Sequence, residues 1–109
     1  MLLNFDTMQA RTVEHMRGGE KCVTTAGYAD DKIRIARGKL IPGASIGLHP
    51  HEGSLEVIYI LSGSGRIECD GEIERVSAGL AHYCADGSSH TFINDGEEEI
   101  VYFAVIPQV

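Results

Sequence analysis

Tight-turn signals divide this chain into short segments, and their spacing limits what it can fold into. Thirteen of the 109 residues are glycine, about 12% against an average near 7%. Glycine supplies the positive φ that tight turns need. Turn signals recur about every 8 to 12 residues, and no window of about eleven residues carries a helical period. The pattern predicts an all-β domain, either a sandwich or a barrel.

Several of these short segments have the composition of β-strands. Residues 55–61 are apolar except for Glu56 and rich in β-branched and aromatic residues, which predicts a strand buried on both faces. Asp70-Gly71 and Asp95-Gly96 each separate two strand-like segments. Asp-Gly in that position is a strong hairpin signal. We therefore expect a β-hairpin at each of the two sites.

Length and charge restrict the domain organisation and the function classes. A chain of 109 residues fits one domain, so we expect residues 1–30 to form an amino-terminal arm with one strand and residues 31–109 to form one barrel. Nine basic against sixteen acidic residues give a formal net charge of −7. That charge argues against nucleic acid as a partner, because nucleic-acid-binding surfaces normally carry a basic stripe. The longest apolar run, residues 100–106, is far shorter than the roughly 20 residues of a membrane helix.

The cysteines and the amino terminus bear on the compartment. The three cysteines show no C-x-x-C spacing, which is typical of reduced residues rather than of a disulfide framework. The first residues lack the basic start and the apolar stretch of a signal peptide. We therefore expect a cytoplasmic protein that has no membrane partner.

Three histidines and one glutamate form a candidate metal site. His49 and His51 are two residues apart, so in an extended strand both side chains leave the same face, with Cα atoms about 6.6 Å apart. Glu56 has apolar neighbours on both sides, and a buried carboxylate is costly unless it is paired or bound to a cation. His90 follows a turn at the start of another strand-like segment. Three imidazoles and a carboxylate suit one divalent transition metal ion, namely iron, manganese, nickel, cobalt or zinc.

The segments around these residues resemble the two sequence motifs of the cupin superfamily. Residues 43–63 match the first motif, G-x5-H-x-H-x3-4-E-x6-G, at every fixed position. Residues 79–94 match the second motif, G-x5-P-x-G-x2-H-x3-N, except that Ala85 replaces the proline; Leu80 also replaces an aspartate that is common there. The resemblance implies an antiparallel double-stranded β-helix, or jelly-roll barrel, with a metal inside near its mouth. It maps four residues onto the metal ligands of the family: His49, His51, Glu56 and His90.

Strand parity predicts which residues lie beside the metal. Residues two positions apart on a strand share a face, so counting by twos from the ligands identifies the expected lining of the barrel. Arg34, on an earlier strand-like segment, is a candidate to bind a carboxylate. The expected lining residues are Ser45, Gly47, Ile58, Ile60, Phe92 and Asn94. The substrate-pocket candidates are Arg34, Ile58, Phe92 and Asn94; no general acid or base is identified.

Two functions follow from the resemblance. The first is a metalloenzyme that acts on a small organic molecule in the barrel, as a dioxygenase or as an isomerase or lyase. The alternative is a non-catalytic cupin that binds or senses a small molecule. Many small cupins dimerise through amino-terminal strands, so a homodimer is expected. His15 and His82 fall outside the motifs and are expected to be structural or surface residues, with His82 kept as a candidate for a supporting role behind the ligands.

Overall fold

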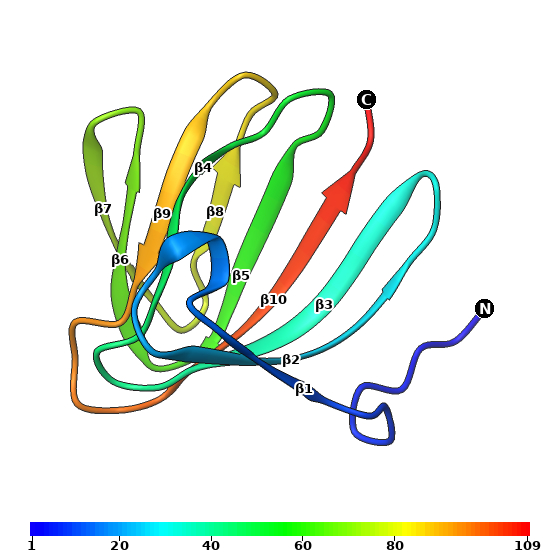
Figure 1. Ribbon diagram of the computed structural model, residues 1–109, viewed down its shortest axis with the longest axis horizontal. Helices are drawn as coiled ribbons and strands as arrows, with labels where there is room; N and C mark the ends of the chain where they lie inside the picture. Colours follow the sequence, from blue (N-terminus) through cyan, green and yellow to red (C-terminus); the bar gives the residue numbers. More distant parts are fainter.

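Two antiparallel sheets face each other and form an open jelly-roll barrel (Figure 1). The computed structural model describes all residues, 1–109. The larger sheet contains, in order, β1 (Arg11–Glu14), β2 (Cys22–Ala29), β3 (Ile33–Leu40), β10 (Ile100–Pro107), β5 (Glu56–Ser62) and β8 (Ala81–Cys84). The smaller sheet contains β4 (Ser45–Pro50), β9 (Ser89–Ile93), β6 (Ser64–Cys69) and β7 (Glu72–Ser77). The predicted all-β jelly-roll fold is confirmed.

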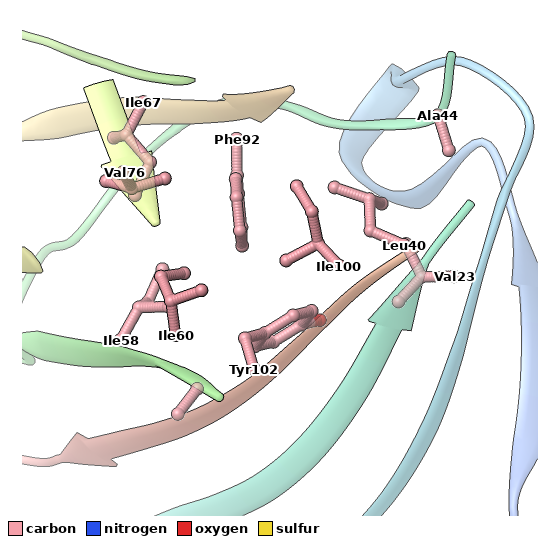
Figure 2. Close-up of a cluster of buried hydrophobic side chains, with 11 residues drawn as sticks. Val23, Leu40, Ala44, Ile58, Ile60, Ile67, Val76, Phe92, Ile100 and Tyr102 are labelled. Carbon is pink, nitrogen blue, oxygen red and sulfur yellow. The ribbon is translucent and has the colours of Figure 1, made fainter. Parts of the chain in front are cut away.

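Apolar side chains from the inner faces of the two sheets form the core (Figure 2). Phe92 reaches in from the smaller sheet and meets Tyr102 of the larger sheet, with ring centroids 5.3 Å apart in an edge-to-face arrangement. Aromatic pairs in this geometry stabilise a core beyond the area that they bury. The remaining buried members are Val23, Leu40, Ala44, Ile58, Ile60, Ile67, Val76, Ile100 and Ala104.

The hairpin predicted at Asp70-Gly71 is confirmed. Strand β6 pairs with β7, and Cys69 lies opposite Glu72 across the turn. Asp70 has φ 50° and Gly71 has φ 84°, the two positive values that a type I′ turn needs. This turn therefore has the local conformation that its sequence favours.

The hairpin predicted at Asp95-Gly96 is wrong. The strands on either side, β9 and β10, belong to different sheets, so residues 94–99 cross from one sheet to the other. Asn94 is completely buried at the start of this crossover. Its side-chain amide donates hydrogen bonds to the carbonyl oxygens of Leu40 and Glu98, both at 2.8 Å, and its Oδ1 accepts one from the Gly96 N–H at 3.0 Å. These long-range contacts override the local turn preference.

Strand β5 is buried on one face only, which corrects the prediction of two buried faces. Glu56, Ile58 and Ile60 point inward and are buried, whereas Val57 and Tyr59 alternate with them on the exposed outer face. The outer face of the larger sheet has no second sheet packed on it at this point (Figure 1).

The amino-terminal arm contains two strands rather than one. β1 and β2 extend the larger sheet, and between them lies a short 3₁₀ turn, η1 (Met16–Gly18). Phe5 packs edge-on against Phe103 of β10, with ring centroids 5.4 Å apart. The structure contains no helix long and apolar enough to cross a membrane.

Candidate metal centre

The fold brings the four predicted metal ligands together at one end of the barrel. His49 lies on β4 directly opposite His90 of β9, His51 follows the end of β4, and Glu56 is the first residue of β5. The loops that join β4 to β5 and β8 to β9 lie at the same end of the barrel (Figure 1). One potential donor atom from each residue lies within 4.8 Å of the donors of the other three.

The spacing of these donor atoms fits a single metal ion. Glu56 Oε1 lies 3.0 Å from His51 Nε2 and 2.9 Å from His90 Nε2. The two Nε2 atoms are 3.2 Å apart. Neighbouring ligands at right angles on an ion with bonds of about 2.1 Å would be about 3.0 Å apart. Three of the donors therefore have the mutual separations that a six-coordinate ion requires.

The second nitrogen of each imidazole is held by a group outside the cluster. His49 Nδ1 lies 2.7 Å from the Gly47 carbonyl oxygen, and His51 Nδ1 lies 3.1 Å from Ser54 Oγ. His90 Nδ1 lies 3.0 Å from His82 Nε2. A carbonyl oxygen only accepts hydrogen bonds, so His49 carries its proton on Nδ1. Such contacts orient metal-binding histidines and leave Nε2 free to bind an ion.

The electrostatics of the cluster favour a neutral imidazole at His49 and an ionised carboxylate at Glu56. Burial lowers the pKa of His49, because a charged imidazolium is poorly solvated there. Burial alone would raise the pKa of Glu56, but hydrogen bonds and charge attraction from His90 and His51 outweigh it and hold that pKa below its ordinary value. His51, Glu56 and His90 are 5%, 8% and 2% exposed. His49 and Glu56 thus favour the deprotonated forms that metal binding requires.

A β-bulge in β4 corrects the predicted lining beside His49. Ile46 pairs with Phe92, and His49 pairs with His90. The paired residues are three positions apart on β4 but two positions apart on β9, so β4 contains one extra residue. The extra residue reverses the alternation of side chains. Ile46 consequently packs against the core, whereas Ser45 Oγ accepts a hydrogen bond from the Glu20 N–H at 2.8 Å. Counting by twos from His49 was therefore wrong for Ser45 and Gly47.

The four substrate-pocket candidates lie in different parts of the molecule. Ile58 and Phe92, each two residues beyond a predicted ligand, are buried in the hydrophobic core. Asn94 is engaged by the backbone of the crossover, and both hydrogens of its amide are used there. Arg34 lines an open hollow of about 310 Å³ together with Arg11 and other residues of the first three strands, and none of the four predicted ligands lines that hollow.

Sequence reasoning did not identify Glu74 or Ser54, and it gave His82 only a minor place. His82 on β8 lies opposite Ile58 of β5, so its inward orientation could have been predicted from strand pairing. Glu74 is an exposed residue of β7, and nothing in its local sequence distinguishes it from its acidic neighbours. Its relation to the cluster depends on the meeting of two strands from different sheets.

The comparisons with known proteins agree with this geometry. Residues 36–106 match the family model described as "Cupin domain". A curated relative from Thermotoga maritima called "Oxalate-binding protein" is 35% identical over 112 residues, covering 97% of this chain and 93% of the relative. A Thermotoga maritima crystal structure, described as that of a predicted oxalate decarboxylase, superposes with a TM-score of 0.94 at 34% identity over the whole of both chains.

A more distant structure supports the fold alone. KdgF from Halomonas sp. superposes with a TM-score of 0.80 at 19% identity, covering 100% of this chain and 94% of that one. The family model spans well over half of the sequence, and the curated relative covers nearly all of it. Both sequence motifs, the barrel and these matches lead to one conclusion: the chain belongs to the cupin superfamily.

Proposed function

We propose that this protein binds one divalent transition metal ion through His49, His51, Glu56 and His90, and binds a small dicarboxylate of the oxalate type at that ion. The observation that carries the proposal is the clustering of four donors, three of them separated by 2.9 to 3.2 Å. Three imidazole nitrogens and one carboxylate suit iron, manganese, nickel, cobalt or zinc. Four protein ligands on a six-coordinate ion leave two positions, which is what a chelating dicarboxylate occupies.

The choice of dicarboxylate rests on two relatives. The Thermotoga maritima relatives, 35% and 34% identical to this chain, are named an oxalate-binding protein and a predicted oxalate decarboxylase. The residues next to the cluster agree with a small ligand, because Ile58 and Phe92 pack tightly in the core close behind Glu56 and His90. We do not assign Arg34 to this ligand, since it lines a separate hollow.

A second candidate is turnover, with the protein acting as a metalloenzyme of the dioxygenase or isomerase and lyase classes. The lyase class has support in the description of one relative as a predicted oxalate decarboxylase. Such a reaction converts hydrogen oxalate into formate and carbon dioxide. Binding without turnover is favoured because the polar groups that touch the ligand histidines, namely Gly47 O, Ser54 Oγ and His82 Nε2, are already engaged in holding them.

Metal analysis and calorimetry test the proposal. The metal-free protein is titrated with Mn²⁺, Co²⁺, Ni²⁺ and Zn²⁺, and with Fe²⁺ under anaerobic conditions. We expect one equivalent of metal in the wild type and in the control variant His15→Ala, and a loss of binding in His49→Ala and Glu56→Gln. A wild type that takes up no stoichiometric metal refutes the proposal.

The loaded protein is then titrated with oxalate, with malonate and acetate as comparisons. Saturable binding of oxalate that disappears in the metal-free protein supports the dicarboxylate. Equal or absent binding of all three acids refutes it. Formate and carbon dioxide released at a steady rate, or oxygen uptake by the iron form, would favour the second candidate over simple binding.

We also propose that the chain forms a homodimer and resides in the cytoplasm. Exposed apolar side chains gather on the outer face of the larger sheet, where Val57, Tyr59 and Tyr83 lie on the neighbouring strands β5 and β8. An exposed apolar patch of this kind is typical of an interface. Free cysteines agree with a reducing compartment. Light scattering after gel filtration tests the dimer, and a monomer at micromolar concentration would refute it.

A further inference from the structure

A chain of hydrogen bonds runs from the protein surface to the ligand cluster. Glu74 Oε1 lies 2.8 Å from His82 Nδ1, and His82 Nε2 lies 3.0 Å from His90 Nδ1. The side chain of Glu74 is 45% exposed, whereas that of His82 is completely buried. The rings of His82 and His90 are stacked, with centroids 5.2 Å apart and an interplanar angle of 28°. A buried histidine thus connects a surface carboxylate to a predicted metal ligand.

The chemistry of the three groups gives this chain one direction. An ionised carboxylate only accepts hydrogen bonds, so the His82 Nδ1–H donates to Glu74. In a neutral imidazole the other nitrogen is then an acceptor, so His82 Nε2 accepts from the His90 Nδ1–H. A bound metal ion would take the lone pair of His90 Nε2; without one, this atom lies 2.9 Å from Glu56 Oε1, which can accept its hydrogen, and 3.2 Å from His51 Nε2.

The hydrogen bond between Glu74 and His82 also connects the free edges of the two sheets. Glu74 lies on β7, the last strand of the smaller sheet, and His82 lies on β8, the last strand of the larger sheet (Figure 1). The pair therefore connects edges that have no further strand to hold them together.

We propose that Glu74 and His82 are positioning residues that set the tautomer of His90, so that its Nε2 lone pair faces the ligand cluster. The effect on metal binding rests on the proposed function, whereas the tautomer of His90 is a property of the protein without metal. Carboxylate–histidine pairs behind a metal-binding histidine raise its basicity and fix its ring. Here the carboxylate acts through one additional imidazole.

A rival use of His82 is a second metal site with two nearby cysteines. Donor atoms of Cys69, His82 and Cys84 lie within 4.8 Å of one another. Both nitrogens of His82 are already engaged at 2.8 and 3.0 Å, so a metal there would have to break one of those bonds. Burial also raises the pKa of the Cys84 thiol to about 12, which disfavours the thiolate that a metal needs. The hydrogen-bond chain is therefore the better assignment.

Metal affinity in four variants is the first test. Apparent Kd for Zn²⁺ and Co²⁺ is measured by competition with a chelator. His82→Phe removes the acceptor for His90 and should weaken binding by about 10- to 100-fold, the usual effect of losing such a partner. His82→Gln retains a side-chain oxygen that can accept from His90 and should recover most of the loss. Glu74→Ala should weaken binding several-fold, whereas Glu72→Ala, which removes an exposed carboxylate from the same strand, should not.

The tautomer of His90 is the second test, and it needs no metal. ¹⁵N-labelled, metal-free protein is examined by long-range ¹H–¹⁵N correlation of the histidine rings at neutral pH. We expect Nδ1 of His90 to be protonated in the wild type, in His82→Gln and in Glu72→Ala, and to lose that proton in part of the molecules of His82→Phe and Glu74→Ala. A residue with a merely structural role would change the melting temperature without moving this signal.

The outcomes separate the two proposals. An unchanged His90 tautomer in Glu74→Ala and in His82→Phe, or in Glu74→Ala alone if His82→Phe does not fold, overturns the inference, whether or not metal binds. Equal metal affinity in the wild type and His82→Phe also overturns it. A wild type that binds no metal refutes the proposed function, while the tautomer measurement still decides the role of His82 and Glu74.

Discussion

Replacing Gly47 with alanine tests how the amino-terminal arm supports the metal centre. Gly47 lies on β4 beneath the 3₁₀ turn of the arm. A Cβ at this position would lie 2.8 Å from the carbonyl carbon of Arg17 and 2.9 Å from the amide nitrogen of Gly19, and closer still to the Arg17 carbonyl oxygen. Because these are backbone atoms, no side chain can turn away to make room. The arm must retreat by more than about 1 Å before ordinary contact with the Arg17 carbonyl oxygen is restored.

The expected cost follows from this forced displacement. Overpacking that shifts the backbone costs about 1 to 3 kcal/mol. An unfolding entropy of about 2.1 cal/mol/K per residue gives about 230 cal/mol/K for 109 residues. The melting temperature of Gly47→Ala should therefore fall by about 4 to 13 °C. A second effect is on the ligand, because the Gly47 carbonyl oxygen accepts the hydrogen bond from His49 Nδ1 at 2.7 Å. Losing about 1 kcal/mol of orientation should weaken metal binding about fivefold.

Thermal unfolding of the metal-free chain, followed by circular dichroism, and the chelator competition measure the two effects. Gly96→Ala is the matched control, since its added Cβ would meet nothing closer than 3.6 Å. That variant should melt at the wild-type temperature or slightly above it, because alanine restricts the unfolded chain. If Gly47→Ala melts with the control, the 3₁₀ turn does not pack on β4 as described and the reasoning is wrong.

Three other predictions concern residues outside the metal centre. Asn94→Ala leaves three backbone groups without their partner, one of them the buried carbonyl of Leu40, and should lower the free energy of unfolding by about 1 to 3 kcal/mol, measured in urea. An unchanged free energy of unfolding would contradict the role of Asn94 in the crossover. Cys84 is fully buried, and the pKa of its thiol is raised to about 12. At pH 8 this thiol should therefore react with iodoacetamide only as fast as the protein unfolds. Rapid labelling of Cys84 in the folded protein would contradict its burial. Hydrogen bonds from Arg75 hold the pKa of Asp95 below its ordinary value of 3.8. The ionised Asp95 therefore stabilises the folded protein fully above pH 3.8, and this contribution is lost as the pH falls through the lower pKa of the folded state. Asp95→Asn should therefore cost up to about 1 kcal/mol at pH 7, and urea unfolding near pH 2.5 should show a smaller difference from the wild type; a difference independent of pH would refute the ion pair.

The predicted ligands could be found from sequence because short-range geometry governs them. His49 and His51 share a strand and its following turn, and Glu56 begins the next strand. Gly63 and Gly87, motif glycines near these segments, adopt φ of 83° and 90°. Those conformations are costly for other residues, so the motif glycines and the turns they build can be recognised together. The same local rule correctly predicted the turn at Asp70-Gly71.

Two of the incorrect predictions, the lining beside His49 and the turn at Asp95-Gly96, depended on contacts between distant segments. The bulge between Ile46 and His49 exists only relative to the partner strand β9, so counting along one strand cannot reveal it. Asp95 has the local sequence of a hairpin turn, but Arg66 and Arg75 bind it from two other strands, at 3.1 and 2.5 Å. The partnership of His82 with His90 likewise joins strands from different sheets. Local propensity is a weak guide wherever such contacts oppose it.

The candidate metal centre therefore consists of the four predicted ligands and, around them, groups that orient their side chains, and most of these surrounding groups fall outside the motif positions. Each ligand histidine is oriented by a different element: His49 by the Gly47 carbonyl under the arm, His51 by Ser54 in the loop before β5, and His90 by His82 on β8. Loss of one support leaves the other two rings oriented, but the three rings contact one another and would share one ion, so the effects of double variants on metal affinity should depart from additivity. The ligand set alone establishes that a metal can be held. The groups that orient the three histidines lie on different elements. Differences among these groups are the means by which the affinity of the site for a metal ion, and the chemistry of that ion, would be adjusted.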